Sequence, residues 1–558
     1  MQNAKTTWKA GAIAGLGATL LMMLGATVQA ADQSRVYVGF APGQKAAVAQ
    51  SLNRAGGTTH YTFDRINAFA VSVPSAALKG LEKNPNILYI EDDPKRYLLA
   101  ESIPYGISMV QATTATQPGA PTDRAVCIVD SGYDLGHPDL PGTNVVSGSN
   151  DSGTGSWSTD ENHHGTHVAG TIAALANNAQ GVIGVMPNSN LNLHIVKVFD
   201  ADGWAYSSSL VAAVQKCEDA GADVVSMSLG GSFKSRSEDA AFREFDKRGI
   251  LSIAAAGNGG KNARASYPAS YGSVVSVAAI DDLKMVADFS QENSQVELAA
   301  PGVAVRSTVP RGQGLNESVS VGGNSYEAVA MGASPKGNVS GALVFCGDGT
   351  STCSGATGKI CLIDRGSITF AAKVLACEDG GGVGAIIANN AGGLYSGTVI
   401  DGGTSIPSVG VAQATGTTLK TMTGQAASVT IQTGDHAYYD GTSMATPHVS
   451  GVAALVWSVG TGCSNADIRA ALQSTAEDLG DPGRDIAYGY GLVQAQSAAA
   501  AIASLSCAGG TGGGGGGGGG GEPPPNTCDL GSVGDSCSSN SECCSNNCKG
   551  KNGSKTCK

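Results

Sequence analysis

The alternation of short apolar strands with helices constrains the fold of this chain more than any other feature. Helical patterns, such as residues 208–220, separate the strands predicted between Arg124 and Thr308, which are 125–129, 193–198, 223–227, 251–255 and 274–278. Strands joined through helices in this way lie parallel in one sheet, with helices on both faces. The sequence therefore predicts an α/β fold with three layers around a parallel sheet.

Three polar residues stand at the ends of these elements. Asp130 follows the first strand, His164 begins a run of small and apolar residues, and Ser443 precedes the apolar run 449–459. Each residue alone is also compatible with a structural role at the end of a strand or the start of a helix. A serine hydroxyl becomes a nucleophile when a base takes its proton and a third group orients that base. Together the three residues predict such a triad.

Four motifs carry a specific resemblance. They read Asp-Ser-Gly at 130–132, His-Gly-Thr-His-Val-Ala-Gly at 164–170, Ala-Ala-Gly-Asn at 255–258 and Gly-Thr-Ser-Met-Ala-Thr-Pro-His at 441–448. In this order they resemble the subtilisin family (subtilases) of serine endopeptidases. The resemblance implies a subtilisin-like catalytic domain at 100–310 and 436–507. It also implies hydrolysis of protein and peptide substrates through an acyl-enzyme, with no cofactor for catalysis.

The same resemblance implies further roles around the triad. Asn258 would stabilise the oxyanion, although a simple turn asparagine is the alternative. Tyr206 would line a second apolar subsite. The substrate backbone and the main specificity pocket, with a broad preference for apolar side chains, would involve Ser228, Leu229, Gly230, Ala255, Ala256 and Gly257.

A structural calcium ion is implied as well. Subtilases gather its oxygen ligands from segments that correspond here to Glu101, Asp139, Leu175, Asn177 and Val182. The chain departs from the family pattern by one extra residue in 176–180 and by Glu101 where glutamine is common, so a solvated loop is the alternative. His163, His164 and His167 raise the separate possibility of a catalytic metal, but the zinc-protease pattern His-Glu-x-x-His is absent.

The first 30 residues have the pattern of a signal peptide. Lys5 and Lys9 precede an apolar run at 11–24, and small residues at 28–30 form a cleavage site. The alternative, a membrane anchor, needs about 20 apolar residues, and this run is shorter. We therefore expect a secreted, extracellular protein that is not held in a membrane after the signal is removed. Its 14 cysteines agree with that compartment.

Residues 31–99 have their own pattern. Strands at 36–40, 69–73 and 87–91 and helices at 44–55 and 76–82 suggest a βαββαβ-like, ferredoxin-like α+β unit. It resembles the inhibitory propeptide of subtilases, which implies autoprocessing near Leu99–Ala100 and inhibition by the protein's own propeptide. An ordinary N-terminal domain is the alternative.

Residues 311–435 interrupt the subtilase pattern. The segments 359–366, 370–377 and 384–390 resemble a protease-associated (PA) domain, a β-rich module that binds or screens substrate. We expect disulfides Cys361–Cys377 in this insert and Cys127–Cys217 and Cys463–Cys507 in the catalytic domain.

The C-terminal part consists of a Gly/Pro linker at 508–527 and a cysteine-rich module at 528–558. Six cysteines in this module allow 15 pairings. Their spacing resembles an inhibitor cystine knot, and zinc binding is the alternative. The linker predicts that the module moves independently of the catalytic domain.

Composition limits the partners of the chain. A net charge of −12 with 14% charged residues argues against nucleic acid, whose binding requires basic surfaces. We expect a monomeric endopeptidase. The rival function is that of a catalytically inactive extracellular protein that binds polypeptide or polysaccharide through the insert and the tail.

Overall fold

The computed structural model describes residues 33–92, 101–117, 124–201, 203–395, 397–400, 403–505, 507, 548–551 and 554–557. The chain divides into two compact units, Met1–Leu99 and Ala100–Lys558. The predicted signal peptide, the processing site near Leu99–Ala100, the linker and four cysteines of the tail lie outside the described residues. No helix among the residues described is long and apolar enough to span a membrane.

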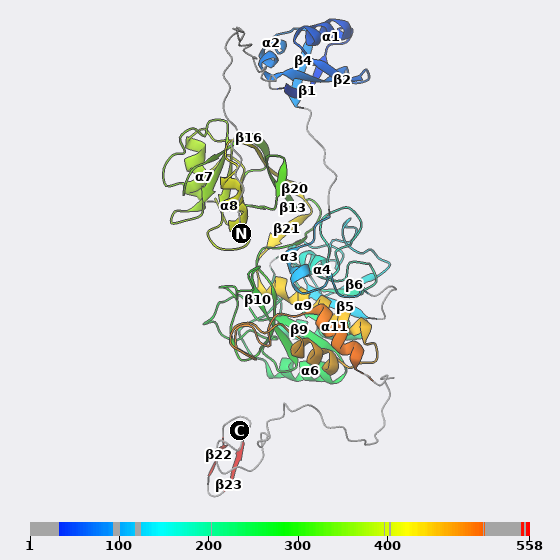
Figure 1. Cartoon of the computed structure of the whole chain (residues 1–558). Coiled ribbons are helices and arrows are strands. Elements are labelled where there is room, and N and C mark those ends of the chain that lie inside the picture. Colours follow the sequence, from blue (N-terminus) through cyan, green and yellow to red (C-terminus); the bar gives the residue numbers. More distant parts are fainter. Residues whose placement is uncertain are drawn as a thin grey trace, which may run out of the picture. The chain divides into compact units, whose positions relative to one another are not determined.

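The first unit is the predicted small α+β unit (Figure 1). Its elements are β1 (Gln33–Phe40), α1 (Lys45–Arg54), β2 (Thr58–Phe63), β3 (Ala68–Pro74), α2 (Leu78–Leu81) and β4 (Ile87–Asp92). The strands form an antiparallel sheet in the order β2-β3-β1-β4. Val48 and Leu52 of α1 are buried in its core. The sequence did not identify β2, because this edge strand is almost wholly exposed and lacks an apolar alternation.

A parallel sheet of seven strands forms the centre of the second unit. Its order is β11-β10-β9-β8-β5-β7-β6, and its strands are β5 (Ala125–Asp130), β6 (Val146–Asn150), β7 (Asn192–Lys197), β8 (Val224–Met227), β9 (Leu251–Ala255), β10 (Val274–Ile280) and β11 (Val296–Pro301). Successive residues of β5 pack into different hydrophobic cores, with Val126 in one core and Cys127 in the other. The predicted fold with three layers is thereby confirmed.

Helices cover both faces of this sheet. On one side lie α4 (His164–Ala173), α9 (Thr442–Val459), α10 (Asn465–Ser474) and α11 (Ala495–Ser504), which share a core with the short α3 (Tyr105–Met109). On the other side lie α5 (Ser207–Asp219) and α6 (Arg236–Lys247). Helix α9 is apolar nearly all round because it is buried against α4 and five strands of the sheet.

The insert has a sheet and cores of its own. Its eight strands follow the order β14-β13-β20-β16-β17-β18-β19-β15. They are β13 (Gly314–Val321), β14 (Asn324–Tyr326), β15 (Val329–Ala330), β16 (Gly337–Phe345), β17 (Ile360–Asp364), β18 (Gly384–Ala388), β19 (Ser408–Val411) and β20 (Ala426–Gly434), accompanied by α7 (Phe370–Asp379) and α8 (Gln413–Lys420). An antiparallel pair, β12 (Val305–Thr308) and β21 (His436–Tyr439), brackets the insert in the sequence.

All three disulfides predicted outside the tail are present. The structure joins Cys127 to Cys217, Cys361 to Cys377 and Cys463 to Cys507. A fourth bond, Cys346–Cys353, closes a short loop of the insert that the sequence did not single out. In the tail, β22 (Cys548–Lys551) and β23 (Ser554–Cys557) form a hairpin, and the cystine knot stays a prediction.

Candidate active site

Asp130 and His164 are held together at the carboxyl edge of the parallel sheet. Asp130 is the last residue of β5 and is fully buried, and His164 is the first residue of α4. His164 Nδ1 lies 2.8 Å from Asp130 Oδ1, which also accepts the backbone N–H of Ser131. A carboxylate can only accept, so Nδ1 carries the proton and Nε2 is left as an acceptor. His163, just before the helix, has the left-handed φ of 74° that turns the chain into α4.

The electrostatic surroundings of His164 favour its protonated form. Burial by itself would lower the pKa of His164, but the charge and hydrogen bond of Asp130 outweigh it, and the charge of Asp160 adds to them. The pKa of His164 is consequently raised above the ordinary value of 6.5. The side chain is still 28% exposed, so a substrate and its protons can reach the ring.

Ser443 lies in the first turn of α9. Its Oγ donates to Ser228 O at 3.1 Å, and Ser228 Oγ donates to Ser443 O at 2.7 Å. Helix α9 packs against α4, the helix that begins with His164. Two helices that are almost 280 residues apart in sequence thus bring their first turns to the same edge of the sheet.

Asn258 is fixed through one end of its amide group. Its Oδ1 accepts hydrogen bonds from Thr442 N at 2.9 Å and Thr442 Oγ1 at 2.8 Å, which leaves Nδ2 free to donate elsewhere. A Cβ added at Gly441 would lie 3.3 Å from Asn258 Nδ2 and 3.5 Å from Ser443 N. The two N–H donors therefore border one small space that glycine leaves open. Asn258 is not among the residues with a positive φ, so the structure gives no support to a left-handed turn role.

A cavity of about 240 Å³ opens beside Ser443. Four of the predicted substrate-binding residues line it, namely Leu229, Gly230, Ala255 and Gly257, together with Asn258 and Ser443. Ser228 and Ala256 are neighbours of this lining in the chain without being part of it, and Tyr206 is not part of it either. Tyr206 is 68% exposed and stacks edge-to-face on Trp204 at 5.2 Å.

Gly231, which also lines the cavity, continues the stretch 228–231 that the resemblance assigns to substrate binding. Sequence reasoning gave no substrate-binding role to the other lining residues, which are Ser232, Arg264, Ser266, Gln291 and Thr442. Arg264, Ser266 and Gln291 belong to loops outside all four motifs, so no local signal marked them. Their side chains reach the cavity only because the loops after β9 and β10 fold against each other: Gln291 Nε2 donates to Arg264 O at 2.6 Å.

The residues proposed as calcium ligands come together only in part. Asp139 O accepts the N–H of Leu175 at 3.0 Å, and Ser102, next to Glu101, forms a parallel bridge with Val182. Glu101 Oε2 is buried without a hydrogen-bond partner in the described structure. These contacts show that the segments meet as the resemblance implies.

The carboxylate of Asp139, however, faces hydrogen-bond donors. Asn178 Nδ2 donates to Oδ1 at 2.6 Å, and Val182 N and His436 Nε2 each donate to Oδ2 at 2.9 Å. A Cβ on Gly181 would lie 2.1 Å from His436 Nε2 and 2.2 Å from Asp139 Oδ2, so this corner is closely filled. N–H groups cannot ligate calcium, which requires oxygen lone pairs. These donors occupy the carboxylate of Asp139, and Asn178 rather than Asn177 reaches it. Calcium binding by Glu101, Asp139, Leu175, Asn177 and Val182 stays a prediction.

His163, His164 and His167 do not converge on a metal site. His167 Nε2 lies 3.0 Å from Val305 O and 3.2 Å from Ala437 O, whereas His164 faces Asp130. Burial lowers the pKa of His167 to about 3, so this ring is neutral and donates to backbone carbonyls. His167 is therefore a buried structural histidine of α4.

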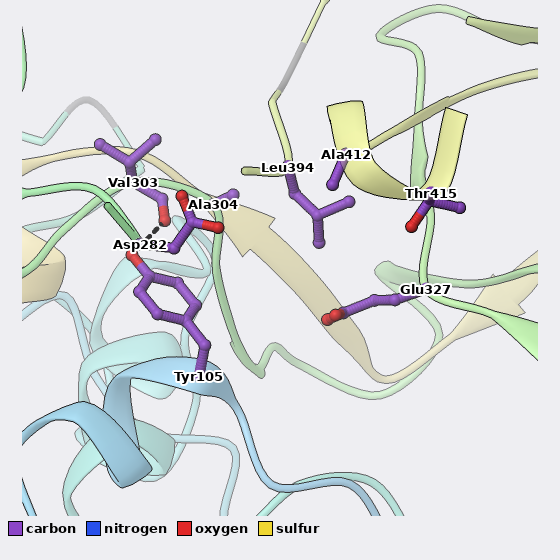
Figure 2. Close-up of a pocket in the computed structure, with 8 residues that line it drawn as sticks. All are labelled: Tyr105, Asp282, Val303, Ala304, Glu327, Leu394, Ala412 and Thr415. Carbon is purple, nitrogen blue, oxygen red and sulfur yellow. Dashed lines mark hydrogen bonds between the residues drawn. The ribbon is translucent and has the colours of Figure 1, made fainter. Parts of the chain in front are cut away.

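A second cavity, of about 100 Å³, contains none of the predicted site residues (Figure 2). Tyr105, Asp282, Val303 and Ala304 line it together with residues of the insert, Glu327, Leu394, Ala412 and Thr415. The hydroxyl of Tyr105 donates to Val303 O at 2.7 Å. Burial, and then the charge of Asp281, raises the pKa of Asp282. The cavity holds no nucleophile and base in contact, so it gives no second catalytic site.

Comparison with known proteins agrees with this geometry. Residues 122–343 and 393–491 match the sequence model described as the subtilase family, and residues 325–419 match the PA domain. The chain is 36% identical over 300 residues to subtilisin J of Geobacillus stearothermophilus, which covers 51% of this chain and 77% of that protein. It is 38% identical over 267 residues to subtilisin E of Bacillus subtilis, covering 47% and 68%.

A solved structure is similar over a longer part of the chain. The psychrophilic subtilisin-like protease from the Antarctic psychrotroph Pseudoalteromonas sp. AS-11 is 44% identical, with a TM-score of 0.67. The match covers 74% of this chain and the whole of that protein.

Proposed function

Because the chain belongs to the subtilase family of serine endopeptidases, we propose that it cleaves proteins through Ser443, His164 and Asp130. The hydroxyl of Ser443 rotates from its hydrogen bond with Ser228 O toward His164 Nε2. His164 Nε2 then takes its proton as Oγ attacks the peptide carbonyl. His164 then protonates the leaving amine, and water releases the acyl group by the same route. The 2.8 Å contact between His164 Nδ1 and Asp130 Oδ1 carries this proposal, because it selects the tautomer that leaves Nε2 basic.

The tetrahedral intermediate needs donors for its oxyanion. Asn258 Nδ2 and Ser443 N border the space left open at Gly441, and both N–H groups are fixed by the start of α9 before substrate binds. Preorganised donors of this kind stabilise the charge that develops in the transition state without reorganising during the reaction. We assign the oxyanion site to this pair.

The cavity beside Ser443 accommodates the substrate side chain that precedes the scissile bond, the P1 side chain. Leu229, Ala255 and the glycines form an apolar and open part of its wall, which supports a broad, apolar-leaning specificity. Ser228 and Ala256 directly follow β8 and β9, in segments that would pair with the substrate backbone. Tyr206, exposed at the start of α5, is the proposed rim of a second apolar subsite.

Maturation and location follow from the parts around the catalytic domain. We propose that residues 31–99 are an inhibitory propeptide removed by the enzyme itself and that the mature protein is an extracellular monomer. The α+β fold of the first unit and the four disulfides support this proposal. The PA insert would screen or bind protein substrates. Homologues in the subtilisin family often bind calcium, and we propose that the segments around Glu101, Asp139 and residues 175–182 hold it in this chain.

Labelling with a fluorophosphonate probe tests the assignment and separates it from an inactive binding protein. The wild-type enzyme should be modified on Ser443 and should lose residues 31–99 during production. The Ser443→Ala variant should be unlabelled, should not hydrolyse casein and should retain residues 31–99 on intact mass measurement. Normal maturation and hydrolysis by Ser443→Ala would refute the role of this serine.

A further inference from the structure

The wall of the cavity beside Ser443 carries a single kind of charge. Of the described residues that line it, Arg264 alone has a charged side chain, and no carboxylate is present among them. We propose that Arg264 is a specificity-determining residue, which favours substrates with a carboxylate in the P1 side chain and disfavours those with lysine or arginine there. The inference rests on the proposed function, because it concerns substrates of the same serine.

The loop that carries Arg264 is anchored against the cavity. Its backbone oxygen accepts from Gln291 Nε2 at 2.6 Å, and Gln291 Oε1 accepts the N–H of Gly259 at 3.3 Å. Gln291 is itself buried and lines the cavity. The backbone of Arg264 is therefore held at the wall, and the residue as a whole is exposed.

The guanidinium is available to a substrate. Arg264 is exposed, and its side chain forms no hydrogen bond or ion pair within the described parts of the chain. The nearby cation Lys261, by contrast, lies 3.5 Å from the carboxylate of Glu292 and is not part of the cavity lining. A substrate carboxylate would give Arg264 its first partner, and bidentate pairing with a carboxylate is the geometry that a guanidinium prefers.

Ser266 adds a second donor to the lining of the same cavity. Ser266 is buried, and a Cβ added to Gly230 would lie 2.2 Å from Ser266 Oγ, so this hydroxyl stands directly against the wall that Gly230 forms. None of the described residues forms a hydrogen bond with it. A glutamate side chain offers acceptor oxygens to both Ser266 and Arg264. A lysine ammonium meets like charge and no carboxylate, and desolvating it without a partner is unfavourable.

The test uses soluble peptide p-nitroanilides that differ only at P1, which is Phe, Gln, Glu or Lys. For the wild type we expect a higher kcat/KM on Glu than on Lys. A charge pair that is exposed or half-buried changes binding by about fivefold. Arg264→Gln should therefore lower kcat/KM on the Glu peptide about fivefold and raise it on the Lys peptide about fivefold, which changes the Glu/Lys ratio by about 25-fold. Arg264→Glu should invert the ratio, and all of these differences should shrink in 1 M salt.

Lys261→Gln is the matched control, because it removes a positive charge from the same loop outside the cavity. It should change the Glu/Lys ratio by less than about threefold, since an exposed charge at a distance is screened. The proposal is overturned if Arg264→Gln leaves the ratio unchanged, if it moves Glu and Lys in the same direction, or if Lys261→Gln has an equal effect. If wild-type enzyme cleaves none of the peptides, including the Phe peptide, the proposed function fails as well, which is a different result.

Discussion

Replacing Asn258 by aspartate tests the oxyanion site most directly. The amide has two ends with different tasks: Oδ1 accepts from Thr442 N and Thr442 Oγ1, while Nδ2 borders the space at Gly441. Asn258→Asp retains an acceptor for both Thr442 bonds and is nearly isosteric, but it replaces the Nδ2 donor with a second acceptor. The variant therefore removes the donor while leaving the anchor of α9 in place.

The expected loss can be stated from the number of donors. Two donors border the oxyanion space, and removing the side-chain donor leaves Ser443 N alone. The loss established for the corresponding donor of subtilisin is about 10²–10³ in kcat, which is about 2.7–4 kcal/mol of transition-state stabilisation. An ionised carboxylate beside a developing negative charge adds repulsion, so Asn258→Asp should lose at least this much. KM should change little, because the oxyanion forms after substrate binding.

The assay compares wild type, Asn258→Asp and Asn258→Ala on one soluble peptide p-nitroanilide and measures thermal inactivation for each. Asn258→Ala removes both ends of the amide and should lose stability as well as turnover, whereas Asn258→Asp should lose mainly turnover. A kcat for a folded Asn258→Asp variant within tenfold of the wild-type value would contradict the oxyanion role. A loss confined to stability would instead identify Asn258 as a structural residue of the helix start.

Two further predictions follow from His164 and His436. Neutral His164 is the base, and Asp130 and Asp160 raise its pKa. We therefore expect kcat/KM to fall as the pH drops through a midpoint above 6.5. A midpoint below 6 would contradict this electrostatic account. His436→Ala should remove one hydrogen-bond donor from buried Asp139 and lower the free energy of unfolding by about 2 kcal/mol. The half-life of the phosphonate-blocked enzyme at elevated temperature should therefore become shorter. His436→Gln, which keeps an N–H donor, should lose less, and an unchanged half-life for His436→Ala would contradict the importance of this contact.

Sequence by itself determined the architecture and the reacting groups. Apolar strands alternating with helices predict a parallel sheet, because each element can bury its apolar face only against the next layer. The motifs around Asp130, His164 and Ser443 identify the chemistry because each residue stands at the end of an element, where its neighbours are small. Strand β2 was not predicted, because its side chains are almost all exposed and its sequence has no alternation of apolar and polar residues.

Tertiary structure alone decided which distant side chains meet. His436 reaches Asp139 across 297 positions of sequence, at the corner where the family resemblance implies calcium. Arg264, Ser266 and Gln291 line the cavity beside Ser443 from loops that have no motif. Local patterns report the preference of each segment for helix, strand or turn, whereas a site depends on the packing of segments that are remote in the chain. The class of reaction was therefore predictable from the sequence, whereas the charge at the wall of the cavity beside Ser443 was not.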